Sequence, residues 1–185
     1  MNAHKETETL KESLQCQFSR RKFLLYSSTA IATTTVMLKI PGSLQAQEAR
    51  ITTYPRKNIA QLSALRQDQP LAFQYPDEGA SSDNLLIKLG KNAGGGIGPD
   101  SDVIAFNTYC THQGGPLGET YNKTHKTFGQ CPFHLSIYDL KRHGIVVAGQ
   151  GYQNLPQILL ELEGDEIYAV GVMGLIFGRN DNLIG

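Results

Sequence analysis

The chain has 185 residues, of which 40% are hydrophobic and 18% are charged, a balance typical of a globular protein with room for one ordinary domain. Its 17 basic and 17 acidic side chains cancel, so the overall charge gives no reason to expect a nucleic-acid-binding protein. Residues 1–46 carry six Lys or Arg against three Glu, which leaves 11 basic and 14 acidic residues for the rest of the chain. We therefore expect a basic, removable segment followed by a mildly acidic body.

The N-terminal segment has the layout of an export signal. Arg20 and Arg21 precede Phe23 and an apolar run rich in small residues, and Leu44-Gln45-Ala46 offers a cleavage site after Ala46. The arginine pair resembles a twin-arginine signal, which implies export of a folded protein to the periplasm. We predict a signal over 1–46 and a single domain over 47–185. The alternatives are a cytosolic amphipathic helix and a retained anchor, although a run of about 16 residues is short for a membrane span of roughly 20.

The body shows short segments rich in branched or aromatic residues, separated by polar or Gly/Pro clusters, and no long helical period. The expected strands are 51–59, 71–75, 85–89, 103–107, 135–140, 145–148, 157–163 and 167–172. Gly164-Asp165 is expected to be a hairpin turn between the last two. We expect 172–179 to be a final core strand, with docking on a partner as the alternative. The fold class predicted is all-β, an antiparallel β-sandwich or barrel with long functional loops.

Two of those loops each carry one cysteine and one histidine. The first reads Cys110-Thr111-His112 and the second Cys131-Pro132-Phe133-His134. Cys16, the remaining cysteine, lies in the N-terminal segment, so the body keeps none for a disulfide. Thiolates are soft, electron-rich ligands and imidazoles are neutral and harder. A set of two and two on separate loops therefore suits a metal or cluster held between the loop tips.

A structural zinc site and a chance pairing of residues are the alternatives for these loops. Structural zinc sites typically pair ligands as Cys-x2–4-Cys and His-x3–5-His, whereas Cys110-x-His112 is tighter and each loop mixes both residue types. The second alternative is a chance pairing of core cysteines with surface histidines. His125 and His143 are expected to be solvated loop residues rather than ligands. No nucleophile has a matching base, so a hydrolase finds no support.

The spacing Cys110-Thr111-His112…Cys131-Pro132-Phe133-His134 resembles the Rieske 2Fe-2S motif. The resemblance implies one 2Fe-2S cluster, with Cys110 and Cys131 on an inner iron and His112 and His134 on an outer iron near the surface. It also implies a Rieske-type β-sandwich or barrel with a two-loop cluster-binding subdomain, and one-electron transfer. Replacing two thiolates by neutral imidazoles makes the cluster less negative and raises its potential to about −150 to +300 mV.

Neighbouring positions refine the resemblance. Ser136 and Tyr138 match the hydroxyl pair of high-potential Rieske proteins, where they donate to a bridging sulfide and to a cysteine sulfur and so stabilise the extra electron. Respiratory Rieske proteins usually join the two loops by a disulfide, but the corresponding positions here are Gly115 and Phe133. We expect packing to replace the disulfide, with Phe133 as the filler and Gly115 leaving room for it.

Residues 89–100 and the tail 155–179, together with the twin-arginine start, resemble the small subunit of arsenite oxidase. That resemblance implies a large molybdopterin subunit with a 3Fe-4S cluster that oxidises arsenite. The present chain would then pass single electrons to a periplasmic cytochrome c or cupredoxin, and would carry no catalytic residue of its own. The alternative function is a Rieske subunit of a quinol-oxidising cytochrome bc-type complex, which is expected to retain an anchor and a hinge.

Overall fold

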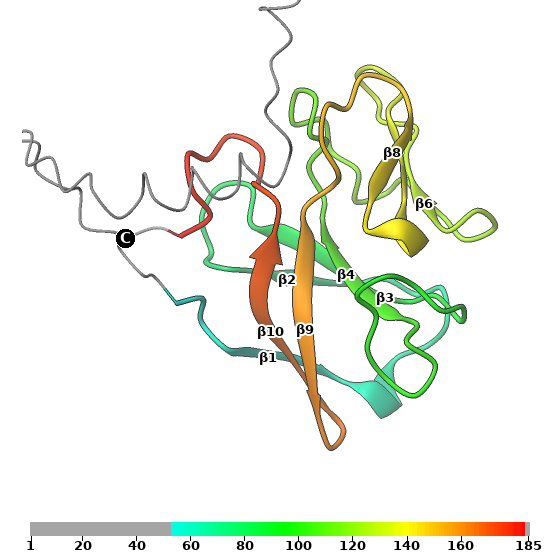
Figure 1. The fold of residues 1–185 in the computed structure, drawn as a ribbon, viewed down its shortest axis with the longest axis vertical. Helices are drawn as coiled ribbons and strands as arrows, with labels where there is room; N and C mark the ends of the chain where they lie inside the picture. Colours follow the sequence, from blue (N-terminus) through cyan, green and yellow to red (C-terminus); the bar gives the residue numbers. More distant parts are fainter. Residues whose placement is uncertain (1–52, 184–185) are drawn as a thin grey trace, which may run out of the picture. The chain divides into compact units, whose positions relative to one another are not determined.

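The structure, a computed structural model, describes residues 53–183 and shows an antiparallel β fold (Figure 1). The signal predicted for 1–46 lies outside the described residues. The helices found within 53–183 are two 3₁₀ turns, η1 (Leu62–Ala64) and η2 (Leu140–Arg142). No helix in this part of the chain is long and apolar enough to cross a membrane. The all-β prediction is confirmed.

The larger sheet has six antiparallel strands in the order β1-β10-β9-β4-β3-β2. They are β1 (Lys57–Gln61), β2 (Leu71–Gln74), β3 (Asp83–Lys88), β4 (Val103–Asn107), β9 (Gln157–Glu163) and β10 (Glu166–Met173). The two edge strands approach each other, since Lys57 Nζ on β1 donates to the Gln74 carbonyl on β2 at 3.0 Å. The Tyr75 hydroxyl likewise donates to the Pro55 carbonyl at 2.8 Å. The sheet therefore curves toward a closed barrel.

The central strands β3 and β4 are buried on both faces. Because successive side chains in a strand point to opposite sides, each strand contributes to two cores. Leu85, Ile87, Ile104 and Phe106 face the core shared with the loops of the second sheet, while Leu86, Val103 and Ala105 face the interior of the six-stranded sheet. Burial on both faces explains why these two segments read as continuous apolar runs.

The smaller sheet is inserted between β4 and β9 and has four antiparallel strands in the order β5-β6-β7-β8 (Figure 1). They are β5 (Tyr121–Asn122), β6 (Thr127–Phe128), β7 (Ile137–Asp139) and β8 (Ile145–Ala148). The two short strands β5 and β6 were not predicted, because two residues are too few to show a period. The expected strand 135–140 is shorter, because Leu135 has a left-handed φ of 60° and belongs to the preceding loop.

The hairpin predicted at Gly164-Asp165 is confirmed, with Glu163 of β9 paired to Glu166 of β10. The final core strand predicted over 172–179 is only partly present. β10 ends at Met173, and Gly174 turns the chain out of the sheet with a φ of 98°. Residues 174–183, named here the C-terminal strap, lie against the sheet without joining it, and Ile176 remains fully buried in the core.

Candidate functional site

The first cysteine–histidine loop, ligand loop 1 (110–115), follows β4. The Cys110 amide donates to the Gly115 carbonyl at 2.9 Å, and the Gly114 amide donates back to the Cys110 carbonyl at 2.8 Å. Gly114 takes a left-handed φ of 67°, which a glycine adopts without steric cost. These bonds fold the segment into a closed turn that carries His112 at its tip.

Ligand loop 2 (131–136), between β6 and β7, repeats the same turn. The Cys131 amide donates to the Ser136 carbonyl and the Leu135 amide to the Cys131 carbonyl, both at 2.9 Å. Leu135 occupies the left-handed position that Gly114 holds in loop 1. The two loops are therefore equivalent in backbone geometry although their sequences differ in length between cysteine and histidine.

The two thiols lie at the bases of these turns and are almost fully buried, unbridged by any disulfide. Burial works against ionisation of Cys110, but hydrogen bonds from the Tyr138 hydroxyl and the His112 amide outweigh it, so the pKa of Cys110 is lowered. Burial raises the pKa of Cys131, and the amides of Phe133 and His134 offset this only in part. Both sulfurs thus accept N–H or O–H donors, as thiolate ligands of a cluster do.

The two imidazoles, one from each ligand loop, lie next to each other. The ring centroids of His112 and His134 are 4.6 Å apart at an interplanar angle of 78°, and His134 is exposed. His112 Nδ1 is buried without a hydrogen-bond partner, a state that proteins rarely tolerate. A metal ion satisfies such a nitrogen. Within 53–183, no three Cys, His, Asp or Glu side chains are grouped as the ligands of a single metal ion would be.

The predicted hydroxyl pair faces the thiols. Ser136 Oγ accepts from the amides of Gln150 at 3.0 Å and Gly151 at 3.1 Å, so both lone pairs are used and its proton is free to be donated. The Tyr138 oxygen lies 3.1 Å from Cys110 Sγ and accepts from the Thr111 amide at 3.1 Å. Burial, and then the neighbouring Cys110, raise the pKa of Tyr138 to about 12, which keeps its donor proton in place.

Sequence reasoning missed the groups that orient these hydroxyls. Thr111 Oγ1 donates to the Gln153 carbonyl at 3.0 Å and lies 3.0 Å from the Tyr138 oxygen. The segment 149–153 forms a third loop over Ser136 and Tyr138, so close that a Cβ on Gly149 would lie 2.4 Å from the Ser136 backbone. The sequence Gly149-Gln150-Gly151 directly after a strand is the signal that could have indicated this close approach.

Gly115 and Phe133 lie in contact, as expected for loops joined by packing. A Cβ on Gly115 would come within 2.6 Å of Cys131 Sγ and 3.1 Å of the Phe133 ring. The ring nevertheless keeps 55% of its surface exposed. One side of Phe133 therefore packs against ligand loop 1, and the other side is exposed to solvent next to His134.

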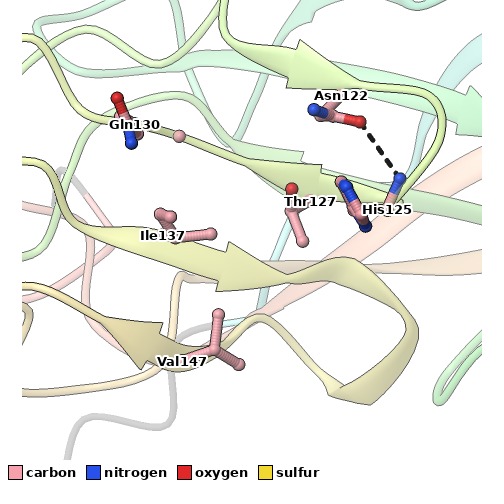
Figure 2. Close-up of a pocket in the computed structure, with 7 residues that line it drawn as sticks. Asn122, His125, Thr127, Gln130, Ile137 and Val147 are labelled. Carbon is pink, nitrogen blue, oxygen red and sulfur yellow. Dashed lines mark hydrogen bonds between the residues drawn. The ribbon is translucent and has the colours of Figure 1, made fainter.

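The histidines outside the two loops are not part of the site. His125 is exposed at the rim of a shallow hollow of about 580 Å³ on the outer face of the small sheet (Figure 2). Its floor includes Ile137 and Val147, and no cysteine or histidine of the ligand loops lines it. His143 is exposed, and its Nδ1 pairs with Gln157 Oε1 at 2.8 Å.

Comparison with known proteins identifies the family. The family model described as "Rieske [2Fe-2S] domain" matches residues 57–158, more than half of the chain. The chain belongs to the Rieske family. This Rieske protein accordingly carries one Rieske 2Fe-2S cluster, and the sequence-based recognition and cofactor prediction are confirmed.

Two relatives of this Rieske protein are named iodate reductase subunit IdrB. That of Pseudomonas sp. (strain SCT) is 49% identical over 160 residues, covering 86% of this chain and 82% of the relative. That of Denitromonas iodatirespirans is 47% identical over 168 residues, covering 90% and 88%. Among solved structures, the soluble domain of Rieske protein II from Sulfolobus acidocaldarius matches with a TM-score of 0.58 at 25% identity, covering 69% of this chain and 83% of that one. The predicted Rieske-type fold is thereby confirmed.

Proposed function

We propose that this Rieske protein is the electron-transfer subunit of a molybdopterin oxidoreductase. Cys110 and Cys131 would hold the inner iron of the cluster, and His112 and His134 would hold the outer iron. When bound, the cluster supplies reversible one-electron transfer. The observation that carries the assignment is the buried, unpartnered His112 Nδ1 next to the exposed ring of His134, on two loops that each also carry a buried thiol.

The side chains around the site have separate tasks. The buried thiols lie in an apolar core that excludes water. The hydroxyls of Ser136 and Tyr138 lie within hydrogen-bonding reach of Cys110 Sγ, where they would stabilise a more negative cluster and so favour its reduction. The exposed edge of His134 offers the shortest way for an electron to leave or enter the protein.

The assembly is proposed from the relatives. Both are named subunits of iodate reductase, which supports a larger catalytic partner, here a molybdopterin subunit with a 3Fe-4S cluster. Iodate is the first candidate substrate for that partner. Arsenite is the second, because residues 89–100 and 155–179 resemble the arsenite oxidase small subunit. A periplasmic cytochrome c or cupredoxin is the proposed redox partner on the other side, and the Arg20-Arg21 pair supports a periplasmic location.

The two substrates require opposite electron flow, which makes them separable. Iodate is an oxidant, so its reduction draws electrons out of the cluster, whereas arsenite oxidation puts electrons in. The purified complex is to be reduced and mixed with iodate, and separately oxidised and mixed with arsenite, while the visible absorption of the cluster is followed. We expect iodate to oxidise the reduced cluster. Reduction by arsenite without any response to iodate makes the enzyme an arsenite oxidase, and no response to either substrate contradicts the proposal.

The ligand assignment has its own test. Cys110→Ser and His134→Ala should each abolish the Rieske-type electron paramagnetic resonance signal, while His125→Ala, an exposed histidine outside the loops, should retain it. A signal that survives in either ligand variant contradicts the assignment. Co-purification with a molybdenum-containing subunit supports the proposed complex, and co-purification with cytochrome b supports the quinol-oxidising alternative instead.

A further inference from the structure

Ligand loop 1 lies between two phenylalanine rings. A Cβ on Gly114 would come within 2.5 Å and 2.6 Å of two ring atoms of Phe177, and a Cβ on the adjacent Gly115 would meet the ring of Phe133 at 3.1 Å. Real Cβ atoms do not approach other atoms as closely as the first contact requires. The turn thus fits between the rings only because two consecutive residues lack side chains.

The two rings come from different parts of the chain. Phe133 belongs to ligand loop 2, so it can only fix one ligand loop relative to the other. Phe177 belongs to the C-terminal strap, which is attached to the six-stranded sheet. Its neighbour Ile176 is fully buried in the core of that sheet. Of the two ring contacts, only that of Phe177 therefore joins ligand loop 1 to the larger sheet.

Hydrogen bonds hold the strap around Phe177 in shape. The Ile176 amide donates to Asn182 Oδ1 at 2.9 Å, and Asn182 Nδ2 donates to the Gly174 carbonyl at 2.6 Å. One buried amide side chain thereby closes the strap into a loop with Phe177 between its ends. Because the backbone of Phe177 is fixed on both sides, its ring loses little further conformational entropy when it packs on Gly114. The packing contact is therefore opposed by only a small entropy cost.

An ion pair anchors the strap two residues after Phe177. The two terminal nitrogens of Arg179, Nη1 and Nη2, donate to Asp77 at 2.7 Å and 3.0 Å, and the Arg179 side chain is only 9% exposed. Arg179 also donates to the Ala80 carbonyl at 2.7 Å. Hydrogen bonding to Arg179, partly opposed by burial, holds the pKa of Asp77 well below its usual range, so the pair stays ionised. The strap is a fixed element on which the Phe177 ring is mounted.

We propose that Phe177 is a positioning residue for the cluster. Its ring, resting on Gly114, holds the 112–115 turn and hence the outer-iron ligand His112 in place, where a disulfide between the two loops is absent. The inference rests on the proposed ligand role of His112. It assigns to the tail of the chain a part in setting the geometry of the redox centre.

The test compares Phe177→Ala with two matched variants of the full-length chain carrying its cluster. Phe177→Ala should speed the loss of visible cluster absorbance below the unfolding temperature by about fivefold, the factor that roughly 1 kcal/mol of lost packing gives. It should also broaden or shift the Rieske resonance signal. Phe177→Tyr keeps the ring and should restore both. Leu175→Ala removes an exposed apolar side chain from the same strap and should change neither.

A second measurement separates this inference from the ligand assignment. In the cluster-free chain, Phe177→Ala should accelerate hydrogen exchange at the Gly114 amide, which is bonded to the Cys110 carbonyl, more than at the corresponding Leu135 amide of loop 2. Unchanged exchange and an unchanged resonance signal, with only a lower unfolding temperature, would show a purely structural role and overturn the proposal. Retention of the Rieske signal in His112→Ala refutes the ligand assignment, while the exchange result still decides whether Phe177 holds the loop.

Discussion

At the scale of single residues, the reduction potential of the proposed cluster depends on whether the hydroxyls of Ser136 and Tyr138 donate their protons to sulfur. Ser136 Oγ has both lone pairs occupied by backbone amides, so its proton is free to be donated to Cys110 Sγ. The Tyr138 proton has two acceptors at similar distance, Cys110 Sγ and Thr111 Oγ1. A charged thiolate is the stronger acceptor, so we assign the Tyr138 proton to sulfur.

Tyr138→Phe removes that donor and should lower the reduction potential. A hydrogen bond to a charged group is worth about 1.5 to 3 kcal/mol. Because 59 mV corresponds to a tenfold change for one electron, the expected drop is on the order of 100 mV, measured by protein-film voltammetry. Tyr75→Phe is the control, since it also loses one partly buried hydroxyl hydrogen bond, to the Pro55 carbonyl, but next to the six-stranded sheet and outside the ligand loops. Equal potentials in Tyr138→Phe and the parent protein would show that the Tyr138 proton points to Thr111.

The residues proposed to carry the chemistry could be picked out from the sequence because the features that mark them are local. Cys110, His112, Cys131 and His134 are recognisable by donor type and spacing, and Ser136 and Tyr138 by their offset from His134. Thr111 was not, because its role comes from contacts with Tyr138 and Gln153 that only the folded chain brings together. Leu135 was wrongly predicted to lie in a strand. Leucine rarely adopts the left-handed backbone conformation that closes this loop, so the residue type does not indicate it.

At the scale of elements, one buried ion pair fixes the small sheet to the larger one. Lys126, in the turn between β5 and β6, has a side chain that is only 7% exposed, and its Nζ lies 2.6 Å and 2.8 Å from the two oxygens of Asp68, which follows η1. The Tyr121 hydroxyl donates to the same carboxylate. Burial opposes ionisation of Asp68, but the bonds from Lys126 and Tyr121 prevail and lower its pKa.

Asp68→Asn leaves the Lys126 ammonium buried without its counter-charge, and should cost about 3 kcal/mol or more of unfolding free energy at neutral pH. Because the folded pKa of Asp68 is depressed, its contribution is complete above the ordinary carboxyl pKa and is lost as pH falls through the folded value. The difference between parent and variant should therefore shrink in acid. Arg142→Ala breaks a pair at 3.8 Å whose arginine is 78% exposed, and should change stability by less than about 1 kcal/mol. A pH-independent difference for Asp68→Asn would contradict this account.

The strand bounds could be predicted from the sequence where a run of branched residues ends in a clear turn. The predicted bounds of β4, β8 and β9 agree with the structure, because each is a run of branched residues bounded by turns. β5 and β6 exist because Phe128 and Tyr121 pack into the core over the ligand loops, a tertiary effect that a two-residue strand cannot reveal. The tail leaves the sheet at Gly174 for a similar reason, since Asn182 donates to the Tyr54 hydroxyl and Arg179 to the Ala80 carbonyl, both far away in sequence.

At the scale of the whole domain, the apolar side chains next to His134 form a contact surface without charge. Phe133 and Leu135 flank His134 and are 55% and 58% exposed. Exposed groups of this kind beside a redox ligand allow close approach of a partner, and their lack of charge makes docking depend little on salt. Leu135→Asp should slow electron exchange with the catalytic subunit by about tenfold, as loss of roughly 1.4 kcal/mol of docking energy implies, while leaving the potential nearly unchanged.

Val147→Asp is the matched control for that prediction. Val147 is similarly exposed but lies on β8, in the hollow of Figure 2, away from the ligand histidines. Stopped-flow mixing with the catalytic subunit at two salt concentrations gives the rates. If Val147→Asp slows transfer as much as Leu135→Asp, the partner approaches the small sheet over its outer face rather than at the loop tips.

At the scale of the whole molecule, the N-terminal residues outside the described structure are predicted to direct export of the protein to the periplasm. A cluster inserted among buried thiols requires a folded protein, so a route that exports folded chains fits the site. The double variant Arg20→Lys/Arg21→Lys keeps the charge of the segment but removes the planar guanidinium groups, so only a receptor that reads arginine itself should reject it. We expect the variant to accumulate in the cytoplasm with its cluster intact, measured by cell fractionation and the resonance signal. Lys22→Arg should export normally, and periplasmic accumulation of the double variant at the parent level would rule out the twin-arginine route.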